Sequence, residues 1–199
     1  MQTTTRRGRP PEADAHEVAR IALDLFERHG FDHVTRDQIA AASGVSRRTL
    51  FRLFPSKSDL VWDGIEDVLT LVQPRVARRG AGRSVHALMR TVIEPVLRII
   101  ENPAAAAIAR RRLRLMTHAP VLLHHPALRE LEAALGQMLQ THAAAAGIAA
   151  TLMARAMVST LFGALLWWSE QDTSMSALDV ARAALRSVAL LERRRDHAT

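Results

Sequence analysis

Apolar residues recur about every 3.6 positions through most of this chain, and Pro or Gly separates one such segment from the next. Few stretches alternate apolar and polar residues as a half-buried strand would. The first clear segment ends at Gly30, and one helical face of it holds Val18, Ile21, Ala22, Leu25 and Phe26. The pattern therefore predicts an all-α protein without strands.

Helix-capping residues predict two short helices after the first. Residues 35–38 have the spacing of a capping box, so a second helix is predicted to start at Thr35 and to end at Gly44. Ser46 is a suitable N-cap for a third helix, which Pro55 ends. Two short helices joined by a turn that contains Gly are typical of a helix-turn-helix.

The rest of the chain is predicted to be a larger helical body. A fourth, longer helix opens at residues 56–59, and an Arg- and Gly-rich linker follows at residues 75–83. Further helices are predicted at residues 84–101, 104–116, 126–146, 148–169 and 176–195, which makes about nine in all. Three parts are thus expected, namely a flexible basic arm (1–11), a small head (12–56) and a body (57–199).

Composition excludes several classes of protein. The chain has 199 residues, 48% of them hydrophobic, which favours a globular fold over disorder. It has no Cys, which excludes disulfides and thiolate chemistry. The charge-free run 156–168 is too short to span a bilayer, and the first residues do not form a secretory signal. A cytoplasmic location is expected.

Placement of charge is more informative than its sum. The net charge of +7 suggests a polyanionic partner. Residues 1–60 hold ten of the positive and eight of the negative side chains, a net charge of only +2, so the sum does not locate the binding site. Arg47 and Arg48 lie in the first turn of the third helix, where the helix dipole disfavours cations, and no acidic residue lies between positions 41 and 58. DNA phosphates and guanine edges would compensate these charges. A solvated helix face is the alternative interpretation.

A second cationic segment precedes the first helix. Arg6, Arg7 and Arg9 stand just before Pro10 and Pro11, in an extended arm that could lie in a minor groove of DNA. An unstructured, solubilising tail is the alternative.

These residues carry a family resemblance. Residues 22–31 (ALDLFERHGF), 39–46 (IAAASGVS) and 49–60 (TLFRLFPSKSDL) are similar to the DNA-binding domain of the TetR family of bacterial repressors, with the Gly and Pro positions in register. The resemblance implies an all-α homodimer whose third helix enters the major groove. It also implies that residues 12–56 bind DNA and that residues 57–199 dimerise and bind an inducer. Such a protein would be associated with the bacterial nucleoid.

The resemblance also implies roles for single residues. Thr35 and Arg36 would contact phosphate, and Lys57, the only Lys in the chain, would hold another phosphate. Bases or nearby phosphates would be contacted by Ser46, Arg47, Arg48 and Thr49, and the DNA backbone by Arg52. Phe51 stands where the family commonly has a Tyr that binds phosphate, so that only packing against the DNA backbone is expected of it.

The body offers candidates for an effector pocket. Large, adaptable apolar side chains could line the pocket, and Arg110 and Arg114 could stand at its mouth. The apolar candidates are Trp62, Met89, Met116, Met138, Met157, Leu161 and Trp168. The segment 109–116 resembles the body of the acyl-CoA-responsive subgroup that includes the mycofactocin-system regulators, which implies an acyl-CoA-like effector. For the Met and Trp residues, the alternative is ordinary core packing. For the arginines, the alternative is charge compensation by Glu101, Glu130 and Glu132.

Two helical faces are candidates for a dimer interface. Residues 152–168 are apolar nearly all round, so this helix must be buried on both sides. Together with the last helix it could form a four-helix interface around a two-fold axis. Packing within a single subunit is the alternative. The candidates are Leu152, Ser159, Gly163, Trp167, Leu178, Ala181, Leu185 and Val188.

No constellation for catalysis is found. Residues 79–83 lack the Lys-Ser/Thr of a phosphate-binding loop, and no nucleophile elbow occurs. His118, His124 and His125 have no carboxylate cluster nearby, so no metal and no cofactor are expected. The hypothesis is a repressor that binds a palindromic operator and is released by a small apolar or acyl-CoA-like effector. The alternatives are a constitutive DNA-binding protein whose body only dimerises, and a helical enzyme or lipid carrier.

Overall fold

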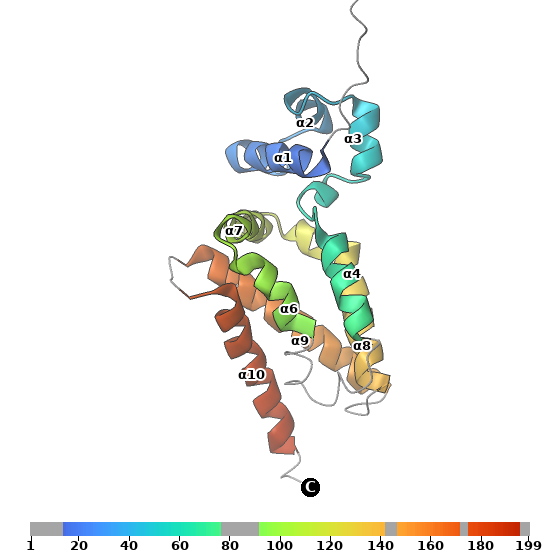
Figure 1. Cartoon of the computed structure of the whole chain (residues 1–199), viewed down its shortest axis with the longest axis vertical. Coiled ribbons are helices and arrows are strands. Elements are labelled where there is room, and N and C mark those ends of the chain that lie inside the picture. The colour runs from blue at the N-terminus through green and yellow to red at the C-terminus, as the bar shows by residue number, and fades with distance from the viewer. Residues whose placement is uncertain (1–13, 77–91, 142–146, 172–174, 196–199) are drawn as a thin grey trace, which may run out of the picture. The chain divides into compact units, whose positions relative to one another are not determined.

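A computed structural model describes residues 14–76, 92–141, 147–171 and 175–195. The chain divides into two compact units, Met1–Asp63 and Gly64–Thr199. The described residues contain nine α-helices, short 3₁₀-helices and no strand, as the 3.6-residue period predicts (Figure 1). Leu60, Val61 and Trp62 are buried and belong to the first of these units.

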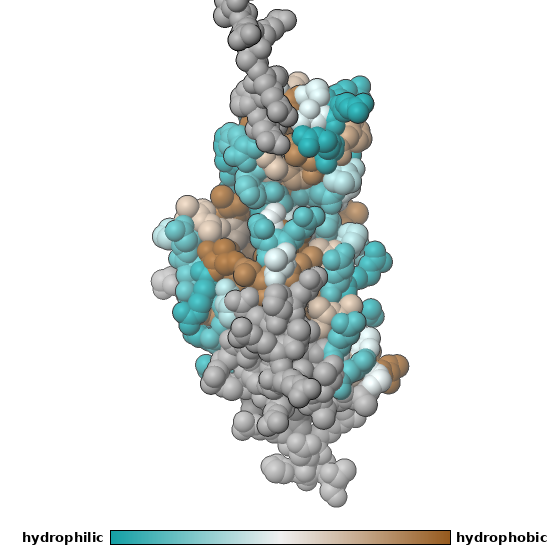
Figure 2. Space-filling view, turned by 45° about the vertical axis from the view of Figure 1, so that its right-hand side comes forward, coloured by the Kyte–Doolittle hydropathy of each residue, from teal (hydrophilic) through white to brown (hydrophobic). Residues whose placement is uncertain are grey.

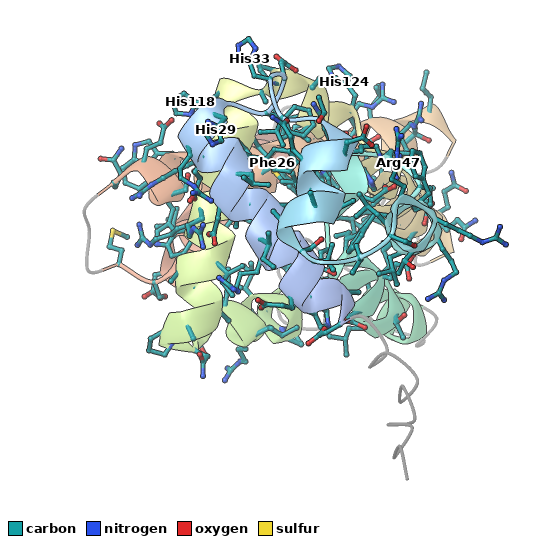
Figure 3. All side chains as sticks on the ribbon, turned by 90° about the horizontal axis from the view of Figure 1, so that it is seen from above. Phe26, His29, His33, Arg47, His118 and His124 are labelled. Carbon is teal, nitrogen blue, oxygen red and sulfur yellow. The ribbon has the colours of Figure 1, made fainter. Side chains whose placement is uncertain are left out.

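Helix α1, Ala15–His29, supplies much of the core of the N-terminal unit. Asp14 caps its start by accepting a hydrogen bond from the His16 amide, and Gly30, at φ 83°, ends it in a backbone conformation that favours glycine. Phe26 points into this unit, and its ring lies 5.0 Å from that of Phe31, centroid to centroid (Figure 3). The buried residues of α1 are Val18, Ala19, Ala22, Leu23 and Phe26.

Helices α2, Arg36–Ala42, and α3, Arg47–Leu53, form the predicted helix-turn-helix. Thr35 and Gln38 make the capping box, and Ser46 caps α3 by accepting a hydrogen bond from the Thr49 amide. Ile39 and Leu50 are fully buried, so each helix is anchored to the core of the unit by one large apolar side chain.

The predicted fourth helix is divided into two parts. A 3₁₀-helix, Ser58–Leu60, is followed by Gly64 at φ 82°, and α4 runs only from Ile65 to Val76. The left-handed backbone at Gly64 separates the two parts, because a residue with positive φ cannot continue a right-handed helix.

Helix α9, Ile148–Glu170, is the central element of the C-terminal unit. It packs against α7 (Pro103–His118), α8 (Pro126–Thr141) and α10 (Ala177–Arg195), as Figure 1 shows. By length and composition alone α9 could cross a membrane, a property that core helices share. Arg155 interrupts the apolar sequence of α9, and the buried residues of the helix, among them Ala154, Met157 and Trp168, pack within the unit.

Shorter elements complete this unit. The segment predicted as one helix, 84–101, is described only from residue 92, and there it consists of α6, Glu94–Leu97, and a 3₁₀-helix, Arg98–Glu101. The side chain of Asn102 then caps α7 by accepting hydrogen bonds from the Ala104 and Ala105 amides. A 3₁₀-helix, Pro120–His124, which the periodicity does not predict, connects α7 to α8.

Candidate nucleic-acid interface

The exposed side of α3 carries the strongest candidates for DNA contact. Arg47, Arg48 and Arg52 are all exposed, and the first turn of α3 contains no acidic residue. The side chains of Arg48 and Arg52 make no ion pair or hydrogen bond with the described part of the chain. Figure 3 shows Arg47 on this helix. Two arginines are therefore available to an external anion.

Arg47 has an internal partner that was not expected. Its Nε lies 2.6 Å from Oδ1 of Asp37 on α2, and both side chains are more than half exposed. The absence of acidic residues from 41 to 58 gives no sign of this ion pair, because Asp37 precedes that segment in the sequence but lies beside α3 in space. An exposed pair is worth at most about 1 kcal/mol, so a phosphate or a guanine could displace Asp37.

Thr35, Ser46 and Thr49 are occupied in capping. Oγ1 of Thr35 accepts from the Gln38 amide at 3.3 Å, and its own amide donates to Oε1 of Gln38 at 2.7 Å. Oγ of Ser46 lies 2.9 Å from Oγ1 of Thr49. The hydroxyls thus fix the starts of α2 and α3, the helix ends whose amides can bind phosphate.

Arg36 is half-buried rather than directed outwards. It donates to the carbonyls of Phe54 and Pro55, and its guanidinium carbon lies 3.6 Å from the centroid of the Phe51 ring. Burial lowers the pKa of Arg36, against a smaller opposing effect of Asp59. The expected role of Arg36 in phosphate binding must therefore compete with three internal contacts.

Lys57 is also engaged within the N-terminal unit. Its Nζ donates to the carbonyl of Phe31 at 2.6 Å and to that of Val34 at 3.2 Å, and it lies 4.3 Å from the centroid of the Phe31 ring. Burial lowers the pKa of Lys57, with a smaller opposing effect of Asp32. The sequence gives no sign of this use, because residues 31–34 lie more than twenty positions away.

The arm residues Arg6, Arg7 and Arg9 lie outside the described residues, as do Met89 and the side chains of Met138 and Val188. Trp62, expected at the effector pocket, is buried and belongs to the N-terminal unit.

Arg110 and Arg114 bind the end of α9. Nη1 of Arg110 donates to the carbonyls of Trp168 and Gln171 at 2.8 and 2.9 Å, and Nε of Arg114 donates to that of Ser169 at 2.6 Å. The guanidinium of Arg110 also stacks on the Trp168 ring, 3.8 Å from its centroid. Backbone carbonyls at a helix C-terminus, rather than the expected Glu101, Glu130 or Glu132, thus accept from these two arginines.

The remaining body candidates fall into two groups. Met116, Met157, Leu161, Trp168, Leu178, Ala181 and Leu185 are buried in the C-terminal unit. Because the three from α10 pack inside their own subunit, they are not accessible to a second one, and this part of the expected dimer seam needs correction. Leu152, Ser159, Gly163 and Trp167 are exposed on α9.

A hollow of about 430 Å³ lies between the 3₁₀-helix Pro120–His124, α8 and α9. Leu128, Phe162 and Leu166 are among its apolar lining, and His125, Arg129 and Arg155 are among its polar lining. Ser159 and Gly163 also line it, whereas the residues expected at the effector pocket whose side chains the structure describes do not. Hydrophobic residues appear at the surface among hydrophilic ones in Figure 2.

Comparison with known proteins finds a family model that matches part of the N-terminal unit. Residues 20–62 match the family model described as bacterial regulatory proteins, tetR family. MftR of Mycobacterium tuberculosis, named for regulating mycofactocin biosynthesis, is 38% identical over 73 residues, which is 37% of each chain. The regulator TcmR of Streptomyces glaucescens is 29% identical over 176 residues, covering 83% of this chain and 77% of TcmR. These relatives are named as regulators and not as enzymes.

Solved structures show the same fold over most of the chain. The repressor SmeT of Stenotrophomonas maltophilia has a TM-score of 0.59 at 17% identity, covering 87% of each chain. The TetR-family repressor FadR of Thermus thermophilus, solved with lauroyl-CoA, has a TM-score of 0.53 at 22% identity and covers 87% of this chain and 92% of its own. The chain thus has the fold of TetR-family transcriptional regulators, with that family's helix-turn-helix domain in its N-terminal unit.

Proposed function

We propose that this protein is a ligand-responsive repressor that binds a palindromic DNA operator as a homodimer. The observation that carries the proposal is the exposed face of α3, where Arg48 and Arg52 have no partner within the described residues and Arg47 has only an exposed one. Arginines beside the amides of a helix N-terminus suit both base edges and phosphates.

The homodimer is supported by α9. Ile148, Leu152 and Trp167 are 77%, 57% and 49% exposed, which is unusual for large apolar side chains. With the exposed Ala156, Ser159 and Gly163 they follow intervals of three or four residues, so they share one face of the helix. A two-fold axis across this face would bury both copies of it and would let small residues bring the two helices close together.

A small apolar or acyl-CoA-like effector completes the proposal. Its support is the fold shared with FadR, which was solved with lauroyl-CoA. The effector would act by favouring a dimer in which the two α3 helices no longer match the half-site spacing, so that operator affinity falls.

A constitutive DNA-binding protein remains the second candidate. It is favoured by Arg110 and Arg114, the cations expected at a ligand, because both already donate to carbonyls of α9. Leu113 and Met116 on the same helix are buried. In that case the body would only dimerise.

One experiment separates the two candidates. Duplexes that the wild-type protein enriches from a random-sequence pool are titrated with the protein, alone and with lauroyl-CoA, lauric acid or CoA. A repressor of the proposed kind binds an enriched palindrome and loses affinity with lauroyl-CoA in particular. Binding that no probe alters would favour the constitutive protein, and failure to enrich any sequence would reject operator binding.

A further inference from the structure

Arg36 connects the start of α2 to the end of α3, the two helix ends that the turn between the helices leaves unconnected. Residues 43–46 connect the end of α2 to the start of α3. Arg36, the first residue of α2, donates from Nη1 to the carbonyl of Pro55 at 2.7 Å and from Nη2 to that of Phe54, the C-cap of α3. The start of α2 is thereby fastened to the end of α3.

Phe51 holds the same guanidinium from the side of α3. The distance from the guanidinium carbon to the ring centroid is 3.6 Å, and Phe51 is 49% exposed, so the pair forms a stacked surface. Nε of Arg36 is buried and has no hydrogen-bond partner among the described residues. A buried donor without a partner is costly, which shows that the carbonyls and the ring, rather than solvation, hold the side chain here.

These contacts constrain the direction of α3. Leu50 and the C-cap Phe54 bury α3 against the core, and the planar fork of Arg36 on two successive carbonyls adds directional polar contacts at the far end of the helix. The direction of α3 decides where Arg48 falls relative to a base edge.

We propose that Arg36 is a positioning residue of the helix-turn-helix, fixing the orientation of α3 through Phe51, Phe54 and Pro55, and that it is not a phosphate contact. The inference rests on the proposed function only in so far as α3 reads DNA. It also gives Phe51, which lacks a hydroxyl, a role in holding Arg36.

The two roles of Arg36 predict different responses to a conservative substitution. A phosphate contact needs a charge, so Arg36→Lys would keep most of the binding, and Arg36→Ala would weaken enriched and scrambled duplexes alike. A positioning residue needs the planar fork and the stack, which Lys cannot supply.

The test measures the affinity of the full-length protein for an enriched duplex and for its scrambled form across salt concentrations. We expect Arg36→Lys and Arg36→Ala each to weaken the enriched duplex about tenfold, roughly the worth of one base contact, and to leave the scrambled duplex unchanged. Phe51→Leu should weaken the enriched duplex in the same selective way, and Arg36→Lys with Phe51→Leu should lose little more than Arg36→Lys alone.

Matched controls define the scale. Arg52→Ala removes an exposed cation of α3 and should weaken both duplexes while lowering the salt slope by about one. Arg20→Ala removes an exposed cation of α1, outside the proposed interface, and should change neither affinity. The inference is overturned if Arg36→Lys binds both duplexes like wild type, or if both Arg36 variants behave like Arg52→Ala.

A second measurement does not depend on DNA. Amide hydrogen exchange in residues 47–53 should be faster in Arg36→Lys and in Phe51→Leu than in wild type, with residues 15–29 unchanged. Equal exchange in α3 would count against the inference. If Arg36→Ala does not fold, Phe51→Leu still tests the inference, because the side chain of Phe51 is exposed and its substitution leaves the core intact. If the wild type enriches no duplex, operator binding fails while the exchange experiment still tests Arg36.

Discussion

At the scale of single residues, the structure separates arginines that can meet DNA from cations that hold the fold. Arg48 and Arg52 are exposed, without a partner in the described chain. Arg36 and Lys57 donate to backbone carbonyls and lie on aromatic rings. All four carry the same charge in the sequence, so only their surroundings distinguish them.

Arg48→Ala tests the DNA-contacting group. We expect it to weaken the enriched duplex by about 1 to 3 kcal/mol and to relax the preference for bases at one position of each half-site, because a bidentate contact with guanine is lost. Binding titrations against a panel of single-base variants measure both effects. An unchanged base preference at every position would contradict this role of Arg48.

Lys57→Met tests the fold-holding group. Because a charged donor is removed from the carbonyls of Phe31 and Val34, we expect the free energy of unfolding to fall by about 1 to 2 kcal/mol. Urea unfolding measures the loss. If Lys57 instead acts mainly on phosphate, stability would stay at the wild-type value, and the salt slope of DNA binding would fall by about one.

At the scale of elements, α7 and α9 are joined by arginines at one helix end. The last carbonyls of a helix have no partner within it, and Arg110 and Arg114 supply donors to three residues there. Trp168, whose ring stacks under Arg110, also donates from Nε1 to the carbonyl of Met175, ahead of α10. One cluster thus joins α7 to α9 and holds the residue that precedes α10.

Arg110→Ala should therefore lower the stability of the C-terminal unit. We expect a loss of roughly 2 kcal/mol in the free energy of unfolding, from two hydrogen bonds and one stacking contact. Arg129→Ala, which removes an exposed cation of α8, is the matched control and should change stability little. Thermal unfolding of the two variants side by side checks this, and equal midpoints would refute the capping role.

At the scale of the whole molecule, the proposed repressor needs two copies, and α9 offers the face for this. Leu152→Glu places a charge on that face, so we expect the molar mass in solution to fall from dimer to monomer and operator affinity to fall with it. Light scattering measures the mass. Val121→Glu, at a residue with the same exposed fraction of 57%, is the control and should remain dimeric. A dimeric Leu152→Glu variant would place the interface elsewhere.

Local chain physics determines much of this protein from sequence alone. Capping at Thr35 and Ser46, the stop at Gly30 and the periodic apolar faces lie within a few residues of what they control, so α1, α2 and α3 are predictable. The family motif is equally local, since residues 20–62 carry it.

Tertiary structure alone decided how the charged and apolar groups are used. Lys57 finds carbonyls at Phe31 and Val34, Arg110 finds the end of α9, and the α10 residues Leu178 and Leu185 face their own core. Such contacts join residues far apart in the chain, and a one-dimensional pattern holds no distance between them. Sequence therefore determined which helices form and which motif they carry, whereas packing determined which cations remain available for DNA.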